Sequence, residues 1–246
     1  MPAPQTLTLD RTLRLGETEV RYRLVRSPKR RRTIGFAIDD AILTVRAPAR
    51  ASFRSIEELA QRHADWILKR LAQTRVLRTR AYESGETLAV LGRPVRILVF
   101  ASGTRRSACT FHGTWIEVRV PTLVAPAARR VAVADALERW YRGFAATVFA
   151  ERAALYAKRL AIKPGRLLVS NPRARWGSCD ASNNIRLNWR LVMAPQDVLD
   201  YVVAHELCHV VHKHHGPRFW RLVASVMPDY RERQRTLREI GPTLAL

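Results

Sequence analysis

The chain is poor in cysteine and has no long apolar run. Its three cysteines, Cys109, Cys179 and Cys208, form neither a CxxC pair nor an even set. Reduced thiols in a cytoplasmic protein are therefore the simplest interpretation. No stretch approaches the ~18 consecutive apolar residues of a membrane span. The first residues also lack the basic start and apolar segment of a secretory signal. We expect a cytoplasmic protein with no membrane partner.

Acidic residues are also scarce. The 246 residues include 21 acidic and 43 basic residues, 38 of the latter arginine, which gives a formal net charge of +22. Residues 1–130 contribute +14 and residues 131–246 contribute +8, with a dense basic run at 29–32. A basic surface attracts polyanions, so non-specific binding of nucleic acid is one expectation. An arginine-rich composition with solvated charges explains the same numbers, and charge alone does not decide between the two.

The order of apolar patterns predicts an α+β fold with a boundary near residue 125. Segments of β type alternate with Gly, Pro and Asp turns over 6–45 and again over 86–120. Between them, Ser55 and Glu58 form a capping box at the start of a helix expected over 55–72. Residues 121–130 are typical of a linker, a long helix is expected over 132–160, and short strands follow up to residue 192. We expect a strand-rich N-terminal region over 1–125 and a second domain over 126–246.

The segment that starts at Pro195 predicts a helix with two chemically different faces. Pro195 and Asp197 suit its first turn. At about 100° of rotation per residue, His205 and His209 share one face, whereas the apolar side chains lie opposite (Leu199, Val203, Leu207, Val210). With Glu206 they form the pattern HExxH, in which two imidazoles bind one zinc ion and the carboxylate removes a proton from a zinc-activated water. The sequence therefore predicts a zinc hydrolase with Glu206 as the general base.

A catalytic zinc usually takes three protein ligands. His212 lies seven residues after His205, which is ~10 Å along the axis of a continuing helix and poorly placed for the same ion. His215 follows the expected helix end, and a chain that turns back after residue 212 would bring it to the metal. Glu232 and Glu239 are the remaining alternatives. We expect one zinc ion per chain, with His205, His209 and His215 as its ligands.

The segment HELCHVVHKHHGPRFW, from His205 to Trp220, resembles the metal-binding segment of the YgjP-like (formerly DUF45) zinc metallopeptidases. That family's pattern has HELxH, a third histidine at this spacing, a small residue and a Phe-Trp pair. Similar motifs occur at 175–179, 184–191, 194–195, 200–203 and 228–230, and the N-terminal half matches more loosely. Gly216 stands where many members carry serine. The resemblance implies a zincin-like metallopeptidase domain over 126–246, with the HExxH helix in its active site and a polypeptide as substrate.

The resemblance also implies that the strand pair before the active helix lines the cleft. An extended substrate would then add to the strand edge as a further strand. Arg175 and Trp176 lie on one strand and Asn188 lies on its partner, so these three are candidates for substrate binding. A structural role in the hairpin, with the indole packed, accounts for the same residues and is the simpler interpretation.

Three functions fit these observations. The motif and the resemblance favour a metallopeptidase that acts on unfolded or extended polypeptide. The second is a metal-dependent nucleoside triphosphate pyrophosphohydrolase, an activity also assigned to some family members. The chain, however, has neither a GxxxxGKS phosphate loop nor a carboxylate cluster suited to magnesium. The third is a DNA-associated protease acting on nucleic-acid-bound proteins. The basic composition favours it, but no zinc-finger, helix-turn-helix or RNP pattern supports sequence-specific binding.

Overall fold

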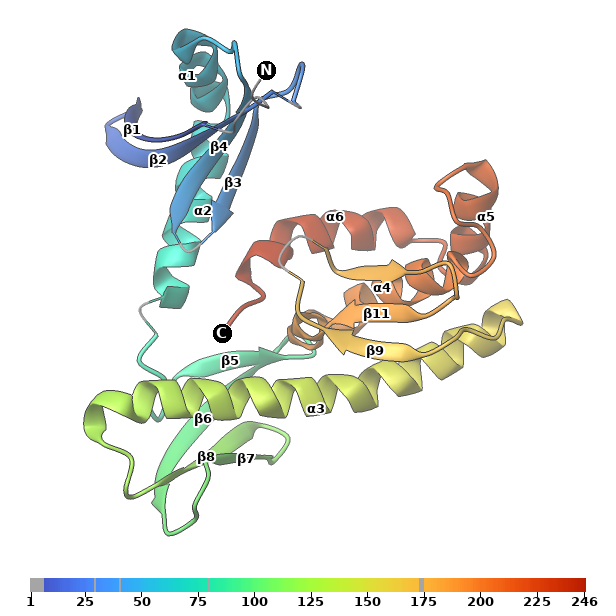
Figure 1. Ribbon diagram of the computed structural model, residues 1–246. Helices are drawn as coiled ribbons and strands as arrows, with labels where there is room; N and C mark the ends of the chain where they lie inside the picture. The colour runs from blue at the N-terminus through green and yellow to red at the C-terminus, as the bar shows by residue number, and fades with distance from the viewer. Residues whose placement is uncertain (1–6, 29, 40, 79, 173–174) are drawn as a thin grey trace, which may run out of the picture. The chain divides into compact units, whose positions relative to one another are not determined.

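The computed structural model describes residues 7–28, 30–39, 41–78, 80–172 and 175–246 of the chain. The chain divides into two units, Met1–Arg80 and Ala81–Leu246, and each has its own hydrophobic core. Figure 1 shows the elements of both units. Within the described ranges, none of the helices combines the length and the apolarity that crossing a membrane requires.

The N-terminal unit is a four-stranded sheet with two helices on one face. Strand β1 (Leu7–Leu15) pairs antiparallel with β2 (Thr18–Ser27), β2 pairs parallel with β4 (Ile42–Pro48), and β4 pairs antiparallel with β3 (Gly35–Asp39). Alternate strand residues point to one face, as the two-residue period of a strand dictates, and are buried against α1 (Phe53–Arg62) and α2 (Ala64–Arg78). The core members with no exposure are Leu15, Leu24, Leu43, Val45, Ala47, Ile56, Ala60 and Ile67.

The single helix expected over 55–72 is two helices in the structure. Helix α1 follows Ser52, whose side chain accepts a hydrogen bond from the Ser55 N–H at 3.0 Å, so Ser52 rather than Ser55 is the N-cap. His63 ends α1, and its N–H donates to the Ala60 carbonyl at 3.1 Å. The break is hidden in the sequence because the buried residues keep the spacing of one helical face: Ile56, Ala60, Ile67 and Leu71.

The C-terminal unit begins with a second four-stranded sheet. Its strands are β5 (Thr87–Val90), β6 (Arg93–Ser102), β7 (Ala108–Phe111) and β8 (Trp115–Pro121), in the order β5-β6-β8-β7. Strands β6 and β8 are parallel, and the other two pairs are antiparallel. The order and the directions repeat those of the N-terminal sheet, although no internal repeat is visible in the sequence. Strand β7 was not expected from the sequence.

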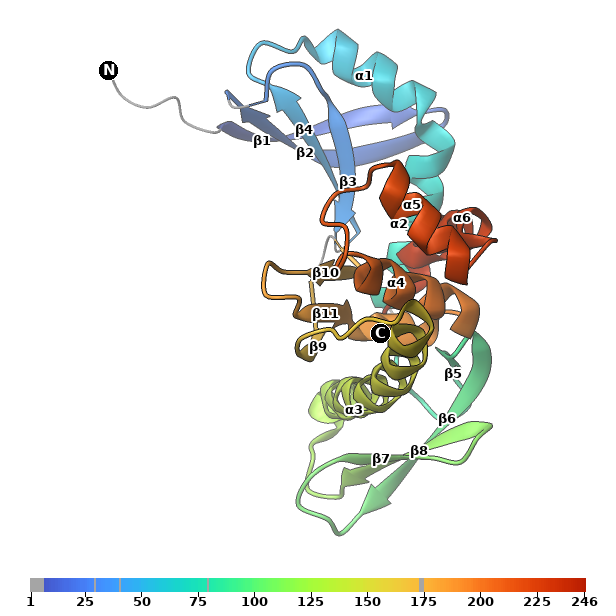
Figure 2. The same ribbon diagram turned by 90° about the vertical axis from the view of Figure 1, so that its right-hand side faces the viewer.

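The long helix α3 (Pro126–Leu160) lies between two layers of the C-terminal unit, as Figures 1 and 2 show. It begins six residues earlier than expected, inside the segment interpreted as a linker. Its Tyr141 hydroxyl donates to the Ala89 carbonyl of β5 at 2.9 Å, and the Leu91 N–H after β5 donates to the Val192 carbonyl at 2.7 Å. These bonds join residues 87–121 to the rest of the unit. The division expected near residue 125 therefore falls inside this unit, between β8 and α3.

A three-stranded sheet and three helices complete the C-terminal unit. The sheet has the order β10-β11-β9, with β9 (Leu167–Ser170) parallel and β10 (Gly177–Cys179) antiparallel to β11 (Ile185–Asn188). The strand expected to reach residue 192 ends at Asn188, which caps the 3-10 helix η1 (Trp189–Met193). Helices α4 (Gln196–Cys208), α5 (Pro217–Val226) and α6 (Tyr230–Ile240) follow, and η2 (Gly241–Thr243) lies near the C-terminus. The expected α+β class is confirmed.

Candidate metal centre

Helix α4 is fixed to α3 by a partly buried ion pair. The Asp200 side chain accepts two hydrogen bonds from the Arg152 guanidinium, each 2.6 Å long, and a third from the Tyr156 hydroxyl at 3.2 Å. Asp200 is 5% exposed, and its hydrogen bond raises the pKa of Arg152. A two-pronged guanidinium–carboxylate pair sets both distance and orientation. The helix that carries HExxH is therefore held in one position against the core.

Three histidine side chains converge at the end of α4. His205 lies in its last turn and His209 is its C-cap, so the helix ends before residue 212 and the chain turns back. The Nε2 atom of His215 lies 3.0 Å from Nε2 of His205 and 3.1 Å from Nε2 of His209. In the described ranges, His205, His209 and His215 form the group of potential metal ligands whose ligand atoms all lie within 4.8 Å of one another. The alternatives His212, Glu232 and Glu239 are not part of this group.

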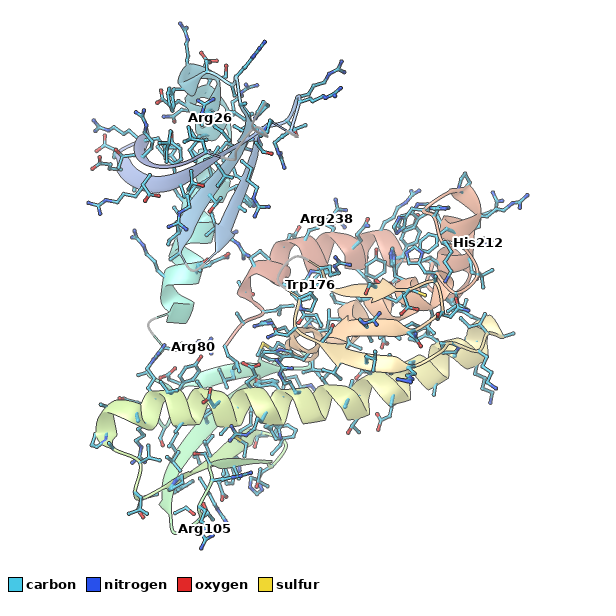
Figure 3. The ribbon with its side chains drawn as sticks, viewed as in Figure 1. Arg26, Arg80, Arg105, Trp176, His212 and Arg238 are labelled. Atoms are coloured by element: carbon cyan, nitrogen blue, oxygen red, sulfur yellow. The ribbon has the colours of Figure 1, made fainter. Side chains whose placement is uncertain are left out.

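Two interactions hold the turn that returns His215. The Nδ1–H of His209 donates to the His212 carbonyl at 2.9 Å, which leaves the Nε2 lone pair facing the other histidines. The Lys213 ammonium donates to the Asp180 carbonyl at 3.0 Å and to Oδ1 of Asn183 at 2.6 Å, both in the β10–β11 turn. Figure 3 labels His212 in this part of the molecule. Lys213 was not expected from the sequence, and its position between the histidines was the only signal for it.

Aromatic rings from α5 and α6 pack around the histidines. The Phe219 ring stacks on His209 with 4.5 Å between centroids. Trp220 stacks on His215 at 5.7 Å, and its ring also stacks on Tyr230 at 5.2 Å. Phe219 is fully buried, so these rings form an apolar wall against the imidazoles, of which His205 and His209 are half-buried and His215 is exposed.

The three imidazoles suit a zinc ion. Burial, with the neighbouring histidines, lowers the pKa of His205 to about 3, and burial also lowers the pKa of His209. Neutral imidazole is the form that binds metal ions. Tetrahedral zinc with Zn–N distances of ~2.05 Å places its nitrogen ligands about 3.3 Å apart. The observed separations of 3.0 and 3.1 Å are close to that spacing.

Glu206, which follows His205 in α4, is buried where β10 passes close to the helix. It is 6% exposed, and burial raises its pKa to about 7, against the opposing charge of Arg175. A Cβ atom on Gly177 would lie 2.6 Å from both Cγ and Oε1 of Glu206, so the missing side chain at 177 leaves room for the carboxylate. A carboxyl group with a pKa near neutrality is suited to exchanging protons. The need for glycine at position 177 was not expected from the sequence, where the motif at 175–179 was the only signal for it.

The three predicted substrate residues lie in different environments. Arg175 is exposed. The Trp176 indole, labelled in Figure 3, packs on Gly241, where an added Cβ would lie 2.9 Å from its Cζ2 atom. Asn188 is 4% exposed, and its side-chain amide donates to the Pro172 carbonyl at 3.0 Å and to the Arg175 carbonyl at 3.4 Å. Asn188 therefore secures the segment before β10, and its amide already has partners within the protein.

One comparison with known proteins identifies an enzyme family. A family model described as YgjP-like, metallopeptidase domain, matches residues 32–240. A solved structure of the metallopeptidase zymogen of Methanocaldococcus jannaschii jannalysin is similar at 18% sequence identity. The match covers 37% of this chain and 94% of that chain, with a TM-score of 0.34. The search of curated proteins found no match.

Proposed function

We propose that this chain, which belongs to the YgjP-like metallopeptidase family, is a zinc-dependent enzyme that hydrolyses peptide bonds with Glu206 as its general base. The observation that carries the proposal is the convergence of three imidazole nitrogens at the end of α4, a helix that also carries the buried carboxylate of Glu206. The family supports a metallopeptidase, and the arrangement of donors supports zinc as its metal.

His205, His209 and His215 would together hold one zinc ion. Three neutral nitrogen donors are a common ligand set of catalytic zinc, whereas magnesium and calcium prefer oxygen donors. Zinc in such a site polarises a carbonyl and lowers the pKa of a water ligand to about 7. The hydrogen bond from His209 to the His212 carbonyl fixes the tautomer that this role requires.

Glu206 would act as the proton carrier of the reaction. Its carboxylate form accepts a proton from the attacking water, and the same carboxyl group then donates it to the leaving amine. Burial favours the first of these transfers, the uptake of the proton, because it raises the pKa of the carboxyl group to about 7 in the metal-free protein. Because Gly177 has no side chain, it leaves room for the carboxylate at this position.

An extended polypeptide would bind along β10. This strand is at the edge of its sheet in the order β10-β11-β9, and it runs past Glu206. A substrate strand could therefore add its backbone hydrogen bonds at this edge. We assign substrate contact to the exposed Arg175, whereas Trp176 and Asn188 position the segment that leads into β10.

All residues proposed for the reaction lie within 126–246, which we propose to be the zincin-like catalytic domain. The three cysteines are free thiols, which fits the cytoplasmic location that we propose. Nucleotide hydrolysis is less well supported, because the described residues bring together no carboxylate set of the kind that binds magnesium.

Digestion of peptides tests the proposal. Zinc-loaded protein would be incubated with denatured proteins and a peptide library, and the products analysed by mass spectrometry. Fragments should form with the wild type and be absent with Glu206→Gln, which retains the three histidines. If zinc-loaded wild type produces no fragments but releases pyrophosphate from nucleoside triphosphates, and Glu206→Gln abolishes that release, the site is a nucleotide hydrolase instead.

A further inference from the structure

The N-terminal sheet has one face that α1 and α2 do not cover. The burial of β2 and β4 alternates along each strand, with the core residues facing the helices. The other positions form the open face, which includes Arg23 and Val25 of β2 and Thr44 and Arg46 of β4. In the parallel register Arg23 lies beside Thr44, and Val25 lies beside Arg46.

A hollow of about 540 Å³ lies at one end of the open face. We name it the basic hollow, and its lining residues are Val25, Ser27, Arg30, Arg31, Thr33 and Arg46. Three of the six are arginines, two carry hydroxyl groups, and none is acidic. Guanidinium and hydroxyl donors are the groups that bind phosphate oxygens.

The basic hollow is partly preorganised by Arg30. Its Nη1 atom donates to the carbonyl and the hydroxyl of Thr33 at 3.1 and 3.0 Å, and its backbone N–H donates to the Ser27 carbonyl at 3.2 Å. The same guanidinium lies above Gly35, where an added Cβ would be 3.3 Å from Nη1. The remaining N–H groups of Arg30 are left for a ligand.

No described residue supplies a counter-charge to the other two arginines of the hollow. In the part of the chain that the structure describes, the side chains of Arg31 and Arg46 make no ion pair and no hydrogen bond, and both are exposed. Among the described side chains of this face, the Asp10 carboxylate forms an ion pair with Nε of Arg23 at 3.4 Å, and neither residue lines the hollow. Residues 1–80 contain 18 basic and 8 acidic residues, a net charge of +10.

We propose that the basic hollow binds the phosphate backbone of nucleic acid without regard to base sequence. A small phosphate compound would be held poorly, because two of the three arginines are exposed and Val25 is the only apolar lining residue. A polymer gains affinity from each phosphate that it places near a cation, through release of its counterions. None of the described lining residues has an aromatic ring on which a base would stack, so we assign the binding to the backbone.

The binding does not depend on the peptidase activity. If that activity holds, the N-terminal unit would direct the enzyme to polypeptides bound to nucleic acid.

Fluorescence anisotropy with a labelled duplex of arbitrary sequence, measured over a range of salt concentrations, tests the proposal on the full chain. The variant is Arg30→Gln/Arg31→Gln/Arg46→Gln. The matched control, Arg54→Gln/Arg62→Gln/Lys69→Gln, removes the same charge from exposed positions of α1 and α2, which cover the opposite face. A single strand of the same length shows whether the hollow requires a duplex.

The hollow variant should bind the duplex at least tenfold more weakly than the control. The slope of its log affinity against log salt concentration should be smaller in magnitude by about 2.7, at ~0.9 for each phosphate that the protein no longer neutralises. The double variant Arg31→Gln/Arg46→Gln keeps the Arg30–Thr33 hydrogen bonds, and the magnitude of its slope should be smaller by about 1.8. Equal weakening in variant and control, or no binding by the wild type, would overturn the proposal. Cleavage of free peptides should be unchanged in every variant, so failure here is distinct from failure of the proposed function.

Discussion

Replacing Gly177 with alanine places a methyl group where the Glu206 side chain lies. The new Cβ would be 2.6 Å from Cγ and from Oε1 of Glu206 and 2.8 Å from its Cδ. Ordinary van der Waals contact begins at about 3.4 Å. The carboxylate must therefore move by about 0.8 Å or more, or β10 must separate from α4. Moving the end of the glutamate side chain is the easier change, because β10 is held by its pairing with β11.

Such a displacement should reduce kcat and also cost some stability. A shift of about 1 Å in a catalytic group can lower the rate by ~100-fold, which is about 2.7 kcal/mol in the barrier. Overpacking of this kind costs roughly 1–3 kcal/mol of folding free energy. Zinc affinity should not change, because the three histidines lie outside the contact.

The assay compares kcat on a fluorogenic peptide with zinc affinity measured by competition with a chelator. Gly216→Ala is the matched control, since Gly216 is also close to the histidines in sequence but an added Cβ there has no atom within 4 Å. We expect the loss of kcat in Gly177→Ala alone. A Gly177→Ala enzyme with kcat near that of the wild type, or an equal loss in Gly216→Ala, would refute the assigned role of Gly177.

Three further predictions concern the same site. His215→Ala should lose most of the bound zinc while circular dichroism stays unchanged, and full zinc occupancy would remove His215 from the ligand set. Lys213→Met should weaken zinc binding by ~10-fold or more, because the turn that carries His215 loses its anchor; unchanged affinity would assign Lys213 no positioning role. Burial raises the pKa of Glu206 from 4.5 to about 7, so its carboxyl group binds a proton more tightly in the folded metal-free protein than in the unfolded chain. The folded protein therefore loses stability as the pH rises between these two values. Glu206→Gln should therefore be more stable than metal-free wild type by about 3 kcal/mol at pH 8 and equally stable at pH 4, as urea unfolding would show; equal stability at both pH values would contradict the burial argument.

The α4 segment could be predicted because its sequence contains two periodic signals at once. Apolar residues at helical spacing indicated a buried face, and His205 and His209 one turn apart indicated a polar one. The position of His215 followed from a length argument, since a continuing helix carries residue 212 too far along its axis. The structure brings these three histidines together, and their role as zinc ligands stays a prediction.

Features that depend on contacts between distant segments could not be predicted in the same way. The need for glycine at position 177 arises from Glu206, 29 residues later, and the role of Lys213 arises from the β10–β11 turn. The break at His63 leaves the apolar spacing intact, so periodicity cannot reveal it. The boundary between the units depends on the bonds of β5 to α3 and η1 rather than on the linker-like composition at 121–130.

Titration of zinc into chelator-stripped protein tests the central claim most directly. Peptide cleavage would be measured alongside zinc binding, for the wild type and for Glu206→Gln. We expect cleavage by the wild type to rise in proportion to zinc and to reach its maximum at one ion per chain, whereas Glu206→Gln binds the same amount of zinc and remains inactive. Cleavage that is independent of zinc, or a Glu206→Gln protein as active as the wild type, would contradict the account.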